Sequence, residues 1–342
     1  MTTTTVRIGT AVSIPLSRRA LGVGAVLAVL LLVAGLLTLT LGSLGIPILT
    51  LPAQVIAPTG SEGFVLTRLR GPRLVTAIGT GAALGIAGAL FQTVTRNPLG
   101  SPDVIGLGVG ASAGAAASAL VWPGVVPVPV GALVGATVAM LVVWAGTGRG
   151  FSSPSRVIIV GIGVSAMGVA VTNLLIARAG REEATVLAAY INGTLASRSW
   201  DDAAIIWASL LVIVPSAMLL GRRLSLIEMG DEIADSLGAK ASTTRAVSIV
   251  VAVAAAAAAV SVAGPVAFIA LIAPQVAKRL TRVGGANVAI SAITGALLIV
   301  AADLAVQNSP FEVQLPVGVL TGAIGGLYLG FLLVREFKKG TI

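Results

Sequence analysis

Residues 74–92 read LVTAIGTGAALGIAGALFQ, an uncharged run close to the ~20 apolar residues that a helix needs to cross a membrane. Its apolar residues follow one another without the polar–apolar alternation that marks a strand of a membrane β-barrel. The run therefore predicts a membrane-spanning helix. Similar runs recur along the chain and predict about ten such helices, near residues 20–41, 74–92, 103–121, 127–146, 156–178, 203–221, 244–263, 266–280, 287–305 and 315–334.

The composition places the whole chain in the membrane class. Of its 342 residues, 56% are hydrophobic and only 10% are charged, whereas about a quarter of the residues of a soluble domain are charged. The chain contains no Cys and no His, which excludes disulfides and sites built on thiolate or imidazole ligands. We therefore predict an all-α polytopic membrane protein that binds no metal or cofactor of its own.

The formal net charge of +9 has a topological explanation. Lys and Arg gather in alternate connecting segments, as basic residues do on the cytoplasmic side of a membrane protein, so the charge does not require nucleic acid. Ala20 to Leu41 is long enough to span, and we interpret it as a retained first helix and not a signal peptide. The predicted organisation is a cytoplasmic tail (1–19), one transmembrane domain (20–335) with a cytoplasmic loop (222–243), and a second cytoplasmic tail (336–342).

The longest hydrophilic stretch on the predicted cytoplasmic side is GRRLSLIEMGDEIADSLGAKASTTR, from Gly221 to Arg245. Its acidic residues recur at helical spacing opposite an apolar side, and Gly238 supplies a helix stop. This pattern predicts a short amphipathic helix suited to docking, with a solvated surface loop as the alternative. The acidic residues are Glu228, Asp231, Glu232 and Asp235.

A second candidate segment is TRNPLGSPDVIG, from Thr95 to Gly106. Each of its two prolines lacks an amide hydrogen and restricts the residue before it, so the segment cannot continue a helix. Non-helical backbone at membrane depth is tolerated where it lines a cavity or is covered by protein. The segment is therefore either part of a translocation pathway or a tight cytoplasmic turn.

Three arginines cluster in RLRGPR, Arg68 to Arg73, on the predicted outer side, where basic residues are disfavoured. A guanidinium group suits carboxylates because it donates two parallel hydrogen bonds. The cluster predicts docking of an acidic partner, and contact with phospholipid headgroups is the alternative.

Glycines at four-residue spacing occur in several runs, and such faces let helix backbones approach closely. We expect them to pack within the chain more often than between chains. The glycines concerned are Gly81, Gly85, Gly106, Gly110, Gly114, Gly131, Gly135, Gly318, Gly322 and Gly326.

Ordered blocks of the chain resemble the FecCD-type permeases, which import ferric siderophores, haem and vitamin B12. Between Arg68 and Leu333 the blocks are GPRLVTAIGTGAALGIAGALFQTVTRNPLGSPDVIGLGVGASAGA, INGTLASRSWDD, LIEMGDEIADSLGAKAS, AGPVAFIALIAPQVAKRL and QLPVGVLTGAIGG. The resemblance implies a ten-helix bundle like that of the vitamin B12 importer permease, in the bacterial inner membrane. Its implied partners are a second permease subunit, identical or different, two cytoplasmic ATPases that bind ATP and Mg, and an external substrate-binding protein.

The resemblance also implies roles for individual residues. Coupling to the ATPase falls on Glu228, Gly230, Asp231, Glu232, Ser236, Leu237 and Gly238. Docking of the binding protein falls on Arg70 and Arg73, and the cytoplasmic gate on Asn97, Pro98 and Leu99. Two departures from the family pattern are Pro274-Gln275, where Pro-His is common, and Val306-Gln307, where Ala-Arg is common. The second departure leaves Arg70 and Arg73 as the main predicted docking charges and hints at a heterodimer.

Other function classes fit the sequence less well. The chain lacks a G-x-x-x-x-G-K-[ST] phosphate loop, so we expect it to be non-catalytic and driven by ATPases on other polypeptides. A proton-coupled secondary transporter would need an ionisable relay, for which only Asp103 and Asp303 are candidates. A purely structural membrane subunit would leave the Pro-broken segment and the acidic helix without a use. The expected substrate is a ferric siderophore, with vitamin B12 or haem as the alternative.

Overall fold

A computed structural model describes residues 3–8, 12–148, 154–180, 184, 187–188, 190–310 and 315–338. Within these residues the regular secondary structure is helical except for one hairpin, in which β1 (Thr3–Ile8) pairs antiparallel with β2 (Val12–Ser17). The hairpin occupies most of the segment that the sequence analysis described only as a tail. Its strands are rich in β-branched residues, which favour extended backbone.

Each of the ten predicted apolar runs contains a helix. By length and composition, seven of the described helices are able to cross a membrane, and two more are apolar but shorter. The ten helices are α1 (Arg18–Thr40), α4 (Gly71–Thr95), α5 (Leu107–Val121), α6 (Val128–Gly146), α7 (Pro154–Arg178), α9 (Trp200–Ile227), α11 (Ala241–Ala263), α12 (Ile269–Thr281), α13 (Val288–Gln307) and α14 (Val317–Lys338).

The run predicted at 266–280 contains a helix too short for a full crossing. α12 has 13 residues, which at ~1.5 Å per residue gives about 20 Å against ~30 Å of hydrocarbon. Gly264 and Phe268 have positive φ values of 71° and 67°. The chain between α11 and α12 is therefore not helical, and it takes up the first residues of the predicted run.

The helix that contains α4 begins earlier than predicted. α3 (Gly60–Phe64), the π-helical turn η1 (Val65–Arg70) and α4 follow one another without a break as far as Thr95. The arginines of RLRGPR therefore lie on a helix and not in a connecting loop. Pro72 therefore stands inside a continuous helix, where the π-helical turn passes into α4, and its missing amide hydrogen leaves one helical bond unmade there.

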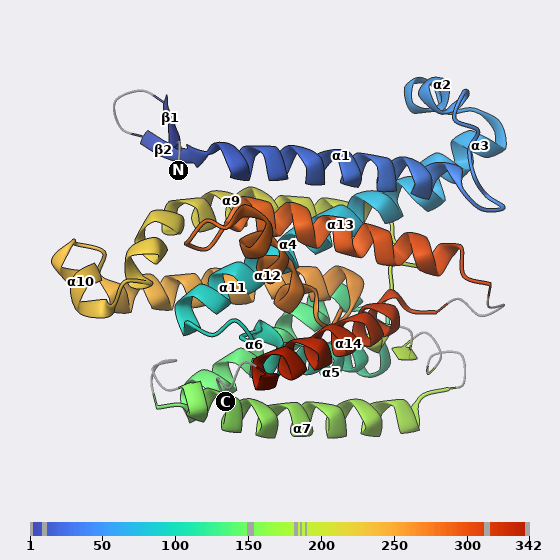
Figure 1. Cartoon of the computed structure of the whole chain (residues 1–342). Coiled ribbons are helices and arrows are strands. Elements are labelled where there is room, and N and C mark those ends of the chain that lie inside the picture. Colours follow the sequence, from blue (N-terminus) through green and yellow to red (C-terminus); the bar gives the residue numbers. More distant parts are fainter. Residues whose placement is uncertain are drawn as a thin grey trace.

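The short elements mark the two ends of the bundle (Figure 1). α2 (Leu51–Ile56) and α3 lie beyond one end, and α10 (Asp231–Ser236) lies at the opposite end. The β1–β2 hairpin and the last residues of α14 lie toward the α10 end (Figure 1). The two chain ends therefore lie on the same side of the bundle. A 3₁₀ turn, η2 (Pro102–Ile105), precedes α5.

α4 forms the centre of the bundle, and most of its residues are buried. Its glycine face lies directly on the backbone of α13: a Cβ built on Gly85 would lie 2.1 Å from the Ser291 carbonyl oxygen, and one on Gly81 would lie 2.4 Å from that of Gly295. A real Cβ does not fit at such distances. The glycines therefore permit a contact between backbones, as predicted.

Other glycine faces have different outcomes. Gly114 and Gly131 face each other across α5 and α6, where a Cβ on Gly114 would lie 2.1 Å from the Gly131 carbonyl oxygen. On α14, Gly318 is packed against Asn192, whereas a Cβ on Gly322 or Gly326 would meet no atom of the described residues within 4 Å. Packing within the chain therefore explains the first three glycines and not the last two.

Candidate functional site

A short exposed helix stands between α9 and α11, as the acidic pattern predicts. α9 continues to Ile227, six positions beyond its predicted end, and a bend at Glu228-Met229-Gly230 leads into α10. Gly230 and Gly238 flank α10 with φ values of 119° and 79°, which non-glycine residues seldom adopt. Backbone conformation at these two glycines therefore sets where the helix begins and ends.

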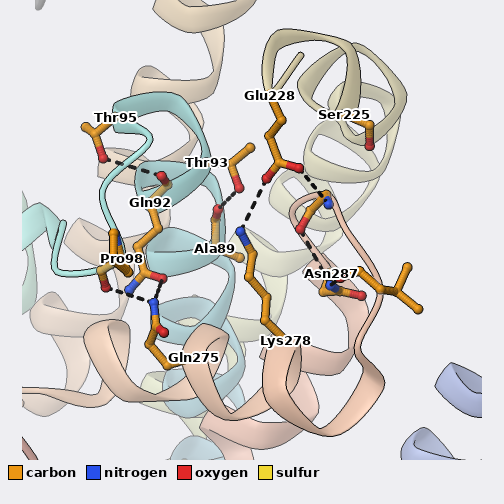
Figure 2. A network of polar contacts seen from close by, with 12 residues as sticks. Ala89, Gln92, Thr93, Thr95, Pro98, Ser225, Glu228, Gln275, Lys278 and Asn287 are labelled. Carbon is orange, nitrogen blue, oxygen red and sulfur yellow. Dashed lines mark hydrogen bonds and ion pairs between the residues drawn. The ribbon is translucent and has the colours of Figure 1, made fainter. Parts of the chain in front are cut away.

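Two of the acidic side chains, Glu228 and Asp235, bind this segment to neighbouring parts of the chain. Glu228 pairs with Lys278 on α12 (Oε1 to Nζ, 3.3 Å; Figure 2). It also accepts a bond from the Gly285 amide at 2.8 Å. Asp235 accepts from the Ala241 amide at 2.6 Å, at the start of α11. These carboxylates are occupied within the chain.

Asp231, the first residue of α10, lies between two arginines. Its Oδ1 is 2.6 Å from Nη2 of Arg96 and 2.6 Å from Nη2 of Arg245. The same Arg96 nitrogen also donates to the carbonyl oxygen of Ile227, the last residue of α9. Arg96 therefore contacts both sides of the bend between α9 and α10.

The remaining side chains of the segment point away from the bundle and form the outer face of α10. Leu237 is 60% exposed, and Glu232 has no hydrogen-bond or ion-pair partner among the described residues. Apolar side chains exposed around a single carboxylate suit a protein partner better than water. The outer face comprises Met229, Glu232, Ile233, Ser236 and Leu237.

The Asn97-Pro98-Leu99 segment is a tight turn directly after α4. Arg96 ends the helix with a φ of 49°, in the left-handed region. The Asn97 side chain accepts from the Leu99 amide at 2.8 Å, and the Asn97 carbonyl accepts from the Gly100 amide at 3.0 Å. The Leu99 side chain is 40% exposed at the surface of this turn.

A pair of glutamines braces this turn (Figure 2). Gln275 on α12 donates from Nε2 to the Pro98 carbonyl and to Oε1 of Gln92, both at 2.9 Å. Gln92 in turn donates to the Leu271 carbonyl at 3.0 Å. In the sequence, Gln275 stood out only as a departure from a family pattern. Its partners lie 177 and 183 positions away, so no local signal could have predicted the contact.

The arginines predicted to dock a partner have contacts inside the chain. Arg73 binds both oxygens of Asp303, which is 1% exposed, with a shortest distance of 2.7 Å. Gln307 donates to the same carboxylate at 2.7 Å. Arg70 is 8% exposed and donates to the Thr38 carbonyl of α1. Arg68 is the arginine of this cluster whose side chain is exposed.

The two carboxylates considered for a proton relay have different surroundings. Asp303 faces Arg73, which would lose its counter-charge if this carboxylate were protonated. Asp103 borders a cavity of about 410 Å³ between η2, α5, α7 and the start of α14, and it accepts a bond from the Ser101 hydroxyl at 3.1 Å. The ion pair argues against a relay through Asp303.

Comparison with known proteins adds to this geometry. The model of the FecCD transport family matches residues 30–335. The chain is a member of this family. It is 39% identical over 280 residues to the ferric enterobactin transport system permease protein FepG of Escherichia coli (strain K12), which covers 82% of this chain and 85% of the relative. It is 32% identical over 318 residues to the Fe(3+)-citrate import system permease protein YfmE of Bacillus subtilis (strain 168), covering 92% and 95%.

The fold of this FecCD permease matches a solved structure described as an inward-facing metal-chelate type ABC transporter. The TM-score is 0.77 at 22% identity, over 92% of this chain and 99% of the other. The predicted family and the predicted all-α membrane architecture are therefore confirmed, and the chain is a transmembrane permease of an ABC importer. The residue roles that the sequence analysis assigned stay predictions.

Proposed function

We propose that this permease imports a ferric siderophore across the bacterial inner membrane, with the α10 end of the bundle in the cytoplasm. The ferric enterobactin and ferric citrate relatives support a ferric chelate as substrate. Lys and Arg collect in the segments predicted to lie on the α10 side, and the chain ends lie toward that side (Figure 1). Both observations support cytoplasmic termini.

The observation that carries the proposal is the outer face of α10. A short helix with exposed apolar side chains, fixed to the bundle by Glu228, Asp231 and Asp235, fits a groove on another protein. We infer that this protein is an ATPase that binds ATP and Mg, and that the permease itself is non-catalytic. A second permease subunit completes the pathway, and an external binding protein delivers the chelate.

Reconstitution in liposomes tests this function directly. The permease, its partner subunit, the ATPase and the binding protein are co-reconstituted, and uptake of ⁵⁵Fe chelates is compared with that of cobalamin and haem. We expect uptake of a ferric chelate that needs both ATP and the binding protein. Uptake that a proton gradient drives without ATP would instead establish the secondary-transporter alternative, and uptake of cobalamin or haem alone would overturn the substrate assignment.

Substitutions on the outer face of α10 test the ATPase contact. Glu232→Lys combined with Leu237→Ser reverses the charge and removes an apolar anchor, and we expect about a tenfold loss of ATPase affinity, the effect of ~1.4 kcal/mol. Asp201→Lys is the control, because Asp201 is also an exposed carboxylate but lies at the start of α9. Equal ATPase co-purification for the two variants would show that α10 is not the docking site.

A further inference from the structure

Arg96 connects the bend before α10 to the turn that follows α4. Its guanidinium holds Asp231 at the start of α10 and the Ile227 carbonyl at the end of α9, while its backbone directly precedes Asn97. Asp231 lies 135 positions away in the chain. The Arg96–Asp231 pair therefore joins two segments that are far apart in the sequence, the turn after α4 and the start of α10.

The backbone around Arg96 is suited to pass on a displacement. The Arg96 amide donates to the Thr93 carbonyl at 3.3 Å, and the Asn97 amide donates to the Gln92 carbonyl at 3.2 Å. Together with the Asn97–Leu99 contact, these bonds make the turn a single bonded unit. A movement applied at the Arg96 side chain therefore reaches Leu99, because the residues between them are fixed to one another.

The turn has a second attachment on the opposite side. Gln275 holds the Pro98 carbonyl to α12, so the turn is held between α10 and α12. Lys278 also joins α12 to the bend, at Glu228, but among the described contacts it has no hydrogen bond to the turn. Arg245, the other partner of Asp231, lies on α11, which follows α10 in the chain, and it has no hydrogen bond or ion pair to the turn among the described contacts.

We propose that Arg96 is a positioning residue that transmits the displacement of α10 to the Asn97-Pro98-Leu99 turn. This inference rests on the proposed function, in which ATP-driven movement of a docked ATPase displaces α10. Charge-assisted bonds from one guanidinium to Asp231 and to Ile227 resist separation more than a single neutral bond would. When α10 moves, Arg96 draws the turn with it against the Gln275 contact, and the position of Leu99 changes.

The test uses the complete transporter and a single reporter thiol. Leu99→Cys introduces a cysteine into a chain that has none, and the rate of its reaction with a maleimide is measured without nucleotide and with ATP plus vanadate. In this background, Arg96→Gln is compared with Arg245→Gln, which removes the other partner of the same carboxylate. We expect the two nucleotide states to differ at least fivefold in the parent and in Arg245→Gln, and less than twofold in Arg96→Gln.

ATPase binding and hydrolysis serve as the second readout, and Arg96→Gln should retain both while uptake falls about tenfold. A full nucleotide response of the thiol in Arg96→Gln overturns the inference. If Arg96→Gln fails to assemble, the same thiol reaction is measured in Arg96→Lys. Lysine keeps the positive charge but has one amine in place of the guanidinium group, so the effect of nucleotide on the thiol should be intermediate. A transporter with the native Leu99 that lacks ATP-dependent uptake refutes the proposed function itself. A parent that transports normally while its thiol ignores nucleotide refutes only the inference.

Discussion

Arg73 and Asp303 form an ion pair whose carboxylate is almost fully removed from solvent. Arg73→Ala would leave that carboxylate buried without a counter-charge, and breaking a buried pair in this way costs about 3–5 kcal/mol. We expect a clear fall in the melting temperature of the purified permease in detergent. Arg68→Ala, the exposed neighbour, is the control and should change the melting temperature little. Equal melting temperatures for the two variants would contradict the supporting role of Arg73.

The contacts of individual side chains could not be predicted from the sequence. Patterns of charge and proline predicted a short helix between Gly221 and Arg245 and a break in the helix after Thr95, and the structure has both. They could not separate Glu232, which is exposed, from Asp231, which is bound between two arginines. Arg96 and Gln275 were missed as contacts because their partners lie 131 or more positions away, and only the packed bundle brings them together.

Among the elements, the α4–α13 contact depends on the absence of side chains. Gly85→Ala would place a Cβ 2.1 Å from the Ser291 carbonyl, so the two helices would have to separate. Since overpacking costs about 1–3 kcal/mol, we expect a lower melting temperature and poorer expression. Gly22→Ala on α1 places a Cβ that meets no atom of the described residues within 4 Å, and it should behave like the parent. Full stability of Gly85→Ala would mean that the contact is looser than described.

Helix positions were predictable from apolar runs, whereas helix ends were not. α9 extends past Arg222 and Arg223 to Ile227, since long basic side chains can leave the membrane while the backbone stays helical. α12 is shorter than its run because the preceding backbone turns at two positions with positive φ. Charged residues in the sequence indicate where a helix leaves the membrane, but the end of the helix itself depends on the backbone conformation.

For the whole molecule, the arrangement of the arginines changes the expected docking surface for a binding protein. Arg70 and Arg73 have contacts within the chain, whereas Arg68 is exposed and has no hydrogen bond or ion pair among the described residues. Arg68 lies on η1, which directly follows α3, and α3 lies at the end opposite α10 (Figure 1). Rim charges act mainly on association rate and are screened by salt. We expect Arg68→Glu to slow capture of the loaded binding protein about tenfold at low ionic strength. Arg178→Glu is the control, and surface plasmon resonance with the reconstituted transporter provides the measurement.

Two outcomes would contradict the role of Arg68 in docking the binding protein. Unchanged association kinetics for Arg68→Glu at low salt would favour the lipid-headgroup interpretation of the cluster. A slower association for Arg70→Glu or Arg73→Glu at an unchanged melting temperature would restore the original assignment to those residues.

The ion pair between Arg73 and Asp303 also has a consequence for how the protein is made. The two residues are 230 positions apart, and a ribosome adding about 5–20 residues per second needs roughly 10–50 s to synthesise that stretch. Throughout this interval the central helix is in the membrane without its counter-charge and without the helix that covers its glycine face. The nascent chain must therefore rely on headgroups or on the insertion machinery to hold that helix until the last quarter of the protein arrives.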